Sequence, residues 1–161
     1  MSKTCLVTGA AGFVASHLIE HIFKTTDWNV VGLDRLDETS TLHRIGDTDA
    51  YKANRHRFRF VWHDLRAPVN AMIAHTIGPV DLVLHLAAST HVDRSITSPG
   101  LFIADNVVAT QHILDFVRFV VSDAAFLMFS TDEVFGPAKP GTSFKEWARY
   151  KASNPYAASK A

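Results

Sequence analysis

A tyrosine and a lysine stand four positions apart near the end of the chain, at Tyr156 and Lys160. The preceding Asn154-Pro155 predicts that a helix begins here, with Asn as its cap and Pro at its first position. Residues four apart on a helix share a face, so the ammonium would stabilise the phenolate and lower a tyrosine pKa that is ordinarily about 10. The pair predicts a base that takes the proton of a hydroxyl group while hydride leaves the same carbon for a nicotinamide.

A second group of reactive side chains, Thr131, Asp132 and Glu133, follows an apolar run. Thr131 is placed to hydrogen-bond a substrate hydroxyl. Two carboxylates that share a desolvated site have pKa values that are driven apart, so one stays an anionic base while the other is held protonated as an acid. Such a pair can eliminate water from a substrate. The alternative interpretation of the two carboxylates is a solvated acidic turn.

A phosphate-binding turn is predicted at Gly9-Ala10-Ala11-Gly12-Phe13-Val14-Ala15, between an apolar run at 4–8 and a helical pattern at 13–24. Gly9 permits a tight turn, Gly12 lets the backbone approach a pyrophosphate, and Ala15 is small enough for helix–strand packing. The phosphates would meet the free N–H groups and the dipole at the start of the helix. An ordinary strand-to-helix turn also uses glycine, so the pattern by itself leaves that alternative open.

Acidic residues follow the next two predicted strands. Asp34 ends the second strand, 22 positions after Gly12, where a carboxylate accepts hydrogen bonds from both ribose hydroxyls of adenosine and repels a 2′-phosphate. This favours NAD over NADP, although a cation at the neighbouring Arg35 could tolerate a phosphate. Asp64 and Leu65 follow the third strand, where the carboxylate suits the adenine amino group and the leucine can pack on the ring.

Short apolar runs alternate with helical patterns along the chain. The periodicity predicts strands at 4–8, 29–34, 58–63, 80–86 and 124–130, and helices at 13–24, 69–76 and 101–121. The polar stretch 35–57 is expected to hold a short helix inside a long connection. The last helix carries apolar residues and a threonine at helical spacing: Ile103, Val107, Thr110, Ile113, Leu114 and Val117. The alternation predicts an α/β fold, with helices on both faces of a doubly wound parallel sheet of the NAD-binding Rossmann type.

Length and composition narrow the function classes. The 161 residues suit one domain, 1–161, and sixteen basic against sixteen acidic residues leave no net charge. There is thus no electrostatic reason to expect nucleic acid or an anionic membrane as the main partner. The single Cys5 excludes an internal disulfide and is expected to be buried. His17 and His21 share a helix face but lack a third ligand, so no metal is predicted.

Apolar stretches and the two ends of the sequence indicate where the protein acts and whether the domain is whole. No apolar stretch reaches the roughly 20 residues that a bilayer span needs, and the first residues lead straight into a strand rather than a signal peptide. We therefore expect a soluble, cytoplasmic protein. The chain stops about two turns into the helix that begins after Asn154. We expect a Rossmann domain that is truncated before its last strands and lacks the substrate domain of a longer enzyme.

These motifs resemble, over essentially the whole chain, the extended short-chain dehydrogenase/reductase family of nucleotide-sugar enzymes, and within it the 4,6-dehydratases that act on dTDP-glucose. The pair Asp132-Glu133 matters most, because sister epimerases and decarboxylases generally lack it at this place. The segments that carry the resemblance are 7–13, 33–36, 85–88, 91–96, 106–108, 130–134 and 156–160.

The resemblance implies a place for NAD and for a nucleotide sugar, dTDP-glucose or UDP-glucose. Thr90 and Thr131 would lie near the substrate, and the full-length protein would be a homodimer through helix 101–121 and the helix that begins at Asn154. The implied NAD contacts are Gly9, Gly12, Phe13 and Val14 at the pyrophosphate, Asp34 and the adjacent Arg35 at the ribose, Asp64 and Leu65 at the adenine, Leu86, Ala87 and Ala88 beside the cofactor, and Tyr156 and Lys160 at the nicotinamide end.

The implied reaction begins when Tyr156 accepts the C4 hydroxyl proton of the sugar as hydride passes to NAD. Glu133 then removes the C5 proton while Asp132 protonates the departing C6 hydroxyl, and hydride returns to C6. Two other hypotheses remain open. An epimerase or decarboxylase of the same family would need Tyr156 and Lys160 but not the acid pair, and a catalytically silent NAD-binding protein would need neither.

Overall fold

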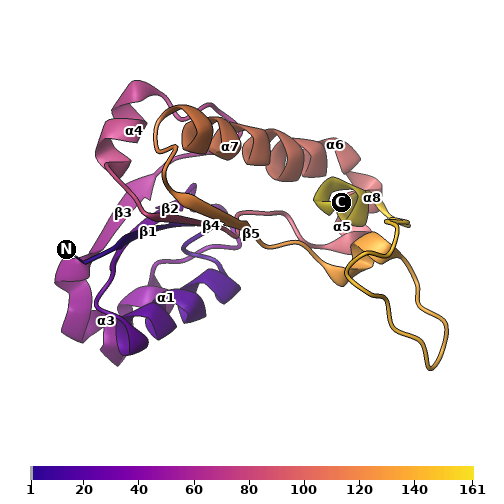
Figure 1. The fold of residues 1–161 in the computed structure, drawn as a ribbon, viewed down its shortest axis with the longest axis horizontal. Helices are drawn as coiled ribbons and strands as arrows, with labels where there is room; N and C mark the ends of the chain where they lie inside the picture. Colours follow the sequence, from indigo (N-terminus) through magenta and orange to yellow (C-terminus); the bar gives the residue numbers. More distant parts are fainter. Residues whose placement is uncertain (1) are drawn as a thin grey trace.

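A parallel sheet of five strands runs through the middle of the computed structural model, which describes residues 2–161 (Figure 1). Its order is β3-β2-β1-β4-β5, and every pairing is parallel. The order reverses between β1 and β4, which is where open sheets of this kind form their ligand crevice. The predicted doubly wound sheet is confirmed. Its strands are β1 (Thr4–Thr8), β2 (Asn29–Asp34), β3 (Phe58–Trp62), β4 (Leu82–His85) and β5 (Ala125–Met128).

Helices cover both faces of this sheet (Figure 1). The first group packs on one face and consists of α1 (Phe13–Thr25), α2 (His43–Gly46) and α3 (Asp49–Asn54). The second group packs on the other face and consists of α4 (Ala71–Ile77) and α7 (Ala109–Phe119). α7 is the last part of a long helix that begins with α6 (Pro99–Phe102) and continues through the π-helical η2 (Ile103–Val108).

Strand β1 shows why the sheet needs cover on both sides. Leu6 lies in the core beneath α4 and α7, with Ile113, whereas Cys5 and Val7 lie in the core against α1, with Ile19. All five side chains are completely buried. Successive strand residues point to opposite faces, and burying each aliphatic side chain contributes about 1.5–3 kcal/mol. Burial also raises the pKa of the Cys5 thiol to about 12, as fits the buried structural cysteine that the sequence predicted.

Side-chain caps begin several of the helices. The Oδ1 of Asn70 and the hydroxyl of Thr48 each accept a backbone N–H at the starts of α4 and α3. The Oδ1 of Asn154 accepts the N–H of Ala157 at 2.7 Å and starts α8 (Pro155–Lys160), with Pro155 in its first turn. Such caps satisfy N–H groups that have no partner inside the helix. The helix start predicted at Asn154-Pro155 is therefore confirmed.

The long helix departs from the prediction of one regular helix at 101–121. Its π-helical segment η2 brings two consecutive polar residues, Asp105 and Asn106, into buried positions. Three of the apolar residues that the sequence showed at helical spacing, Ile103, Val107 and Leu114, are 52%, 44% and 45% exposed.

Other elements differ in extent. β4 and β5 are each shorter than expected, and the stretch 35–57 holds α2, α3 and the 3₁₀ turn η1 (Arg55–Arg57) rather than one short helix. Helix α5 (Val92–Thr97) and the 3₁₀ turn η3 (Asp132–Phe135) were not expected at all. Elements of four to six residues carry too few apolar positions to produce a periodic pattern.

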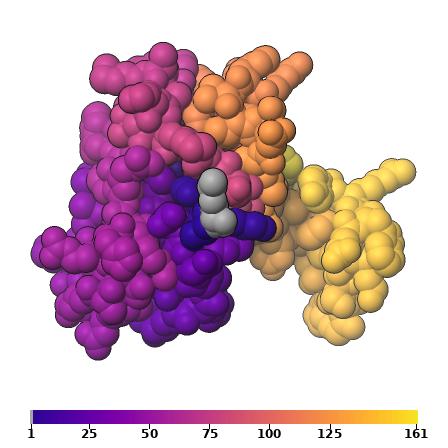
Figure 2. Space-filling model, turned by 60° about the vertical axis from the view of Figure 1, so that its left-hand side comes forward, coloured from indigo at the N-terminus to yellow at the C-terminus, as the bar shows by residue number. Residues whose placement is uncertain are grey.

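The segment 136–153 stands away from the sheet and its helices. It forms the long loop at the right of Figure 1 and a separate yellow lobe in Figure 2. Its aromatic side chains are open to solvent, with Trp147 82% exposed. None of the helices within residues 2–161 combines the length and the apolar character that crossing a membrane requires.

The tight passage at Gly9 yields a stability prediction. Gly9 has φ +66°, and a Cβ at this position would lie 2.9 Å from the backbone N and Cα of Ala87. We expect Gly9→Ala to lower the free energy of unfolding by about 2 kcal/mol or more, because strain and clash add. Gly100→Ala is the matched control, since nothing lies within 4 Å of its Cβ position in α6. Chemical denaturation of both variants checks this, and equal stability losses would contradict it.

Candidate active site

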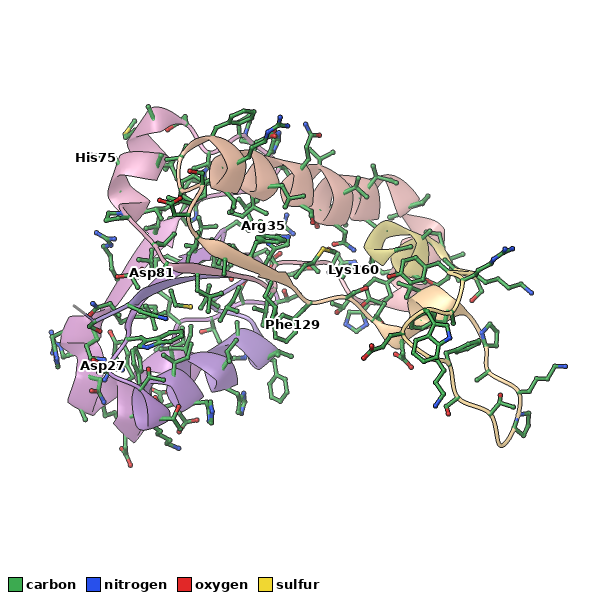
Figure 3. All side chains as sticks on the ribbon, viewed as in Figure 1. Asp27, Arg35, His75, Asp81, Phe129 and Lys160 are labelled. Carbon is green, nitrogen blue, oxygen red and sulfur yellow. The ribbon has the colours of Figure 1, made fainter. Side chains whose placement is uncertain are left out.

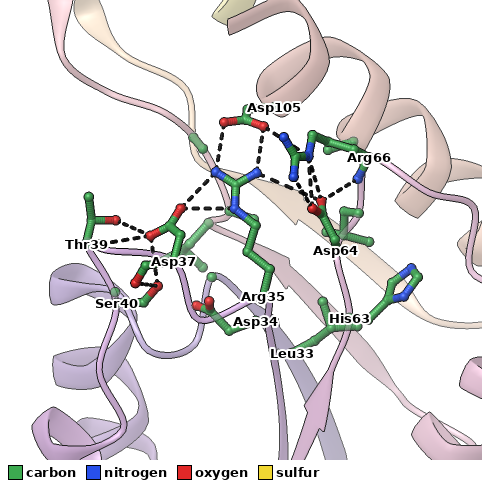
Figure 4. Close-up of a pocket in the computed structure, with 17 residues that line it drawn as sticks. Leu33, Asp34, Arg35, Asp37, Thr39, Ser40, His63, Asp64, Arg66 and Asp105 are labelled. Carbon is green, nitrogen blue, oxygen red and sulfur yellow. Dashed lines mark hydrogen bonds and ion pairs between the residues drawn. The ribbon is translucent and has the colours of Figure 1, made fainter. Parts of the chain in front are cut away.

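A cavity of about 120 Å³ opens at the carboxyl ends of β1, β2, β3 and β4 (Figure 4). It lies at the place where the strand order reverses, between β1 and β4. Its walls therefore come from segments far apart in the sequence. Nine of the residues predicted to contact a cofactor line it: Gly9, Gly12, Asp34, Arg35, Asp64, Leu65, Leu86, Ala87 and Ala88.

The glycine turn forms the floor of this cavity. The N–H of Gly12 donates to the carbonyl of Gly9 at 2.9 Å, and Gly12 is the N-cap of α1 without a side-chain hydrogen bond to the first turn. The first N–H groups of α1 thus remain available to an anion. Phe13 and Val14 do not line the cavity, and their side chains are 70% and 57% exposed.

The carboxylate of Asp34 is held in place by the backbone on either side. Its Oδ2 accepts the N–H of Ala11 at 3.0 Å, and its Oδ1 accepts the N–H of Leu36 at 2.8 Å. The side chain is buried at the end of β2 and lines the cavity. Each oxygen retains capacity for one more hydrogen bond. The carboxylate is therefore positioned to accept further donors from a bound molecule.

Ion pairs cross the cavity and were not foreseen from the sequence (Figure 4). Arg35 donates from Nη1 and Nη2 to the two oxygens of Asp105, at 2.7 and 2.9 Å, and from Nε and Nη2 to Asp37. Arg66 pairs with Asp64 on the far side. Hydrogen bonding to Asp105 raises the pKa of Arg35 above its ordinary value. For Asp37, burial opposes ionisation, but hydrogen bonds from Thr39, Arg35 and Ser40 together hold its pKa well below the usual range.

A buried chain of hydrogen bonds connects β1 with the long helix. The amides of Leu86 and Ala87 donate to Thr8 Oγ1, and Thr8 lies 2.7 Å from Nδ1 of His85. Nε2 of His85 lies 3.0 Å from the hydroxyl of Thr110, which donates to a carbonyl one turn earlier. The Thr110 oxygen must therefore accept from Nε2–H, which leaves Nδ1 to accept from Thr8. Burial, and secondarily the charge of Lys160, lower the pKa of His85 to about 4, so the ring is neutral.

Asn106 extends the polar connection to helix α8. Its side chain bonds both the N–H and the carbonyl of Ser89, and its Nδ2 donates to Ser159 Oγ at 2.8 Å. Ser159 in turn donates to the carbonyl of Tyr156. Helix α8 is thus fixed against the π-helical segment by polar contacts inside the protein.

Tyr156 and Lys160 lie on α8, and Figure 3 labels Lys160 to the right of Phe129. Both are buried, at 9% and 5% exposure. Burial lowers the pKa of the Lys160 ammonium. Among the hydrogen bonds of residues 2–161, none involves the ammonium of Lys160 or the hydroxyl of Tyr156. The predicted pair therefore shares a short helix with its reactive atoms uncommitted.

The acid pair lies on the neighbouring 3₁₀ turn. Asn154 Nδ2 donates to Glu133 Oε2 at 2.8 Å, and Thr131 caps the turn by accepting the N–H of Glu133. Asp132 is exposed and Glu133 is half-buried, so residues 2–161 do not enclose the two carboxylates as the desolvated pair that the sequence suggested. Both line an open groove of about 620 Å³ beside the lobe, together with Phe135 and Phe144.

Some predicted residues lie outside both hollows. Thr90, Thr131, Tyr156 and Lys160 line neither the cavity nor the groove, and Thr90 is exposed. Residues 2–161 contain no cluster of three or more metal-ligating side chains, and Nδ1 of His17 hydrogen-bonds the carbonyl one turn earlier. The residue roles inferred from the sequence stay predictions.

Comparison with known proteins shows which family this chain belongs to. A profile of the family described as GDP-mannose 4,6 dehydratase matches residues 6–161. The chain belongs to this family. Its resemblance to the epimerase/dehydratase group of nucleotide-sugar enzymes is thereby confirmed, and so is its Rossmann-type fold.

Relatives of this family member are named dTDP-glucose 4,6-dehydratases. That of Salmonella typhimurium is 36% identical over 173 residues, which cover 97% of this chain and 47% of the relative. That of Mus musculus is 34% identical over 161 residues, which cover 99% and 44%. The chain spans about half the length of the curated relatives it matches.

Solved structures of the family have the same arrangement. The dTDP-glucose 4,6-dehydratase of Streptomyces venezuelae, solved with NAD bound, has a TM-score of 0.84 at 34% identity over 98% of this chain and 48% of its own. The UDP-Glc/GlcNAc 4-epimerase of Campylobacter jejuni has a TM-score of 0.84 at 28% identity, over 99% and 46%. Dehydratases and epimerases thus share the fold seen here.

The neutral, buried His85 yields a pH prediction for this family member. Its pKa is about 4 in the folded state against 6.5 as the ordinary value. Between these values the unfolded chain binds a proton that folded His85 does not, so the free energy of unfolding falls as the pH drops from 6.5 to 4 and this loss ends below pH 4. The contribution is about 3 kcal/mol.

Denaturation curves over this pH range check the prediction. We expect His85→Gln to flatten the pH dependence, because glutamine does not titrate. His17→Gln, an exposed control on α1, should leave the slope unchanged. An identical slope in wild type and His85→Gln would contradict the neutral assignment.

Proposed function

We propose that this chain forms the cofactor-binding part of an NAD-dependent nucleotide-sugar 4,6-dehydratase. The observation that carries the proposal is the position of Asn154, whose Oδ1 caps the helix of Tyr156 and whose Nδ2 donates to Glu133. One side chain thus ties the acid pair that elimination requires to the helix that bears the tyrosine and the lysine. Relatives with 34–38% identity that are named dTDP-glucose 4,6-dehydratases support the same activity.

The residues that line the cavity suit the adenosine and pyrophosphate of NAD. The close approach of Gly9 to Ala87 and the uncapped start of α1 leave a backbone cradle for phosphates. Asp34 would accept the ribose hydroxyls, and Asp64 with Leu65 would contact the adenine. NAD, when bound, supplies the hydride acceptor for C4 of the sugar and the hydride donor for C6.

The residues of α8 carry out the first proton transfer of the proposed reaction. Tyr156 takes the proton of the C4 hydroxyl as C4 becomes a ketone, and Thr131 hydrogen-bonds the substrate hydroxyl. The charge of Lys160 stabilises the phenolate, since an adjacent cation favours the ionised form. Lys160 also holds the nicotinamide ribose.

The acid pair performs the elimination. Glu133 removes the C5 proton, which the 4-keto group has made acidic. Asp132 protonates the C6 hydroxyl, which leaves as water, and a double bond forms between C5 and C6. Hydride added at C6 and a proton returned to C5 by Glu133 then give a 4-keto-6-deoxy sugar, so the sugar loses one water in total. The substrates we propose are dTDP-glucose or UDP-glucose. Thr90 would lie beside the substrate.

An epimerase is the second candidate, since the Campylobacter jejuni 4-epimerase has the same fold. It needs Tyr156 and Lys160 but leaves Asp132 and Glu133 without a task. We also propose a homodimer, supported by the row of exposed apolar side chains at Ile103, Val107 and Leu114 on the long helix.

Product mass tests the proposed reaction. We expect the protein, in the full length that its gene encodes, to remove one water from a single member of a panel of dTDP-, UDP-, CDP- and GDP-hexoses without added reductant. Mass spectrometry of the products gives the result. A substrate that is isomerised or decarboxylated without water loss would replace the dehydratase by the second candidate.

A substitution of Asp132 tests the elimination step separately. We expect Asp132→Asn to retain oxidation at C4 while water loss slows by about 10²–10⁴-fold, because the general acid is gone. Absorbance of the reduced nicotinamide should then accumulate in a single turnover. Glu146→Gln, an exposed residue of the lobe, is the control and should keep the wild-type rate. Unchanged water loss in Asp132→Asn would remove the acid role.

A further inference from the structure

The walls of the adenosine cavity carry an unusual concentration of paired charge (Figure 4). Two arginines face four carboxylates there, so the wall is net negative. The aspartates are Asp34, Asp37, Asp64 and Asp105, and the arginines are Arg35 and Arg66. An arginine directly after the acidic residue of β2 is the feature that left cofactor choice ambiguous in the sequence, because a free guanidinium there would bind a 2′-phosphate.

The guanidinium of Arg35 is not free. Its four hydrogen bonds to Asp37 and Asp105 use four of the five N–H donors of an arginine. Its Nη1 also lies 3.9 Å from Asp64. A phosphate oxygen that approached Arg35 would have to displace these carboxylates and would meet their charge.

Asp105 is the most buried of the carboxylates that contact Arg35. Its side chain is 3% exposed, and it contacts Arg35 in bidentate geometry. Its Oδ2 also accepts the hydroxyl of Ser89 at 2.7 Å, and the adjacent Asn106 holds the backbone of Ser89 on both sides. A buried charge is costly unless it is paired. Asp105, held in place by the π-helical segment, therefore keeps Arg35 as its partner.

We infer that Asp105 is a specificity-determining residue that occupies Arg35 and thereby restricts the cavity to adenosine nucleotides with a free ribose 2′-hydroxyl. The inference rests on the proposed NAD function and adds a residue to it. Asp34 alone would repel a 2′-phosphate, but the adjacent cation would offset that repulsion. Asp105, with Asp37, cancels the cation, and the wall stays negative.

A third arginine, Arg44, lies close to the cavity and could also receive a 2′-phosphate. Arg44 is exposed, and its Nη1 donates to the carbonyls of Ala11 and Thr39. Arg44 therefore lies near the glycine turn without a carboxylate partner among residues 2–161. The test has to show which arginine receives the phosphate when discrimination is lost.

The test compares adenosine 5′-phosphate with adenosine 2′,5′-bisphosphate. The full-length protein is freed of co-purified nucleotide, and the dissociation constants are measured by ligand-observed NMR or calorimetry. The quantity compared is the ratio of the dissociation constant of the bisphosphate to that of the 5′-phosphate. We expect this ratio to be about ten or more in the wild type and about tenfold smaller in Asp105→Asn. Asp115→Asn makes the same charge change at an exposed position of α7 and should leave the ratio unchanged.

The variant Arg35→Gln completes a double-mutant cycle with Asp105→Asn. The narrowing caused by Asp105→Asn should vanish in an Arg35→Gln background, because the effect requires the released guanidinium. If Asp105→Asn does not fold, Asp37→Asn tests the same release from a more exposed position, with an expected narrowing of about threefold.

Three outcomes would overturn the inference. An unchanged ratio in a folded variant that still binds adenosine 5′-phosphate rejects the role of Asp105 while leaving the NAD proposal intact. A narrowing that survives Arg35→Gln but disappears with Arg44→Gln assigns the phosphate to Arg44 instead. Failure of the wild type to bind NAD or either adenosine nucleotide rejects the NAD function together with this inference.

Discussion

The hydroxyl of Thr8 links the end of β1 to the chain that follows β4, at the point where the cavity opens. It accepts the amides of Leu86 and Ala87 beyond the end of β4 and donates to His85, so every hydrogen-bonding position of the oxygen is used. This contact brings the chain after β4 against Gly9, where there is no room for a side chain. The glycine turn, the cavity wall at 86–88 and the buried histidine therefore meet around this hydroxyl.

From His85 the same set of hydrogen bonds extends to helix α8. Thr110 lies on the far side of the ring, one turn after Asn106, and Asn106 contacts Ser89 and Ser159. His85, Asn106 and Ser159 are buried and paired, and leaving one of them without its partner would cost about 1–3 kcal/mol. The cofactor cavity and α8 are therefore joined by a continuous set of hydrogen bonds, although the residues that line the cavity and those of α8 do not meet in one hollow.

The ion pairs at the cavity add a charge pattern to this geometry. Arg35 reaches from the end of β2 to Asp105 on the long helix, and Arg66 reaches back to Asp64. The chain has no net charge as a whole, yet this wall is negative because carboxylates outnumber guanidinium groups. Beyond the sheet, Asp132 and Glu133 line an open groove together with residues of the lobe at 136–153. The chain spans about half the length of its curated relatives.

Local sequence was sufficient for much of the fold and for the chemistry-bearing motifs. β1, β2, the start of α1 and the cap of α8 lie where the pattern predicted them, because strand alternation, glycine turns and the Asn-Pro pair act over a few residues. The short α5 and η3 escaped prediction, since they are too brief to repeat a pattern. What only the tertiary structure decided is the environment of those motifs.

Arg35 meets Asp105 across 70 positions, and His85 meets Thr8 across 77. The π-helical segment turns Asp105 and Asn106 inward together and leaves Ile103 and Val107 exposed. The sequence by itself thus determined which residue types stand at the ends of the strands and at the start of α8. Their partners were set by packing between distant segments, because hydrogen bonds and ion pairs of this range leave no periodic trace in the chain.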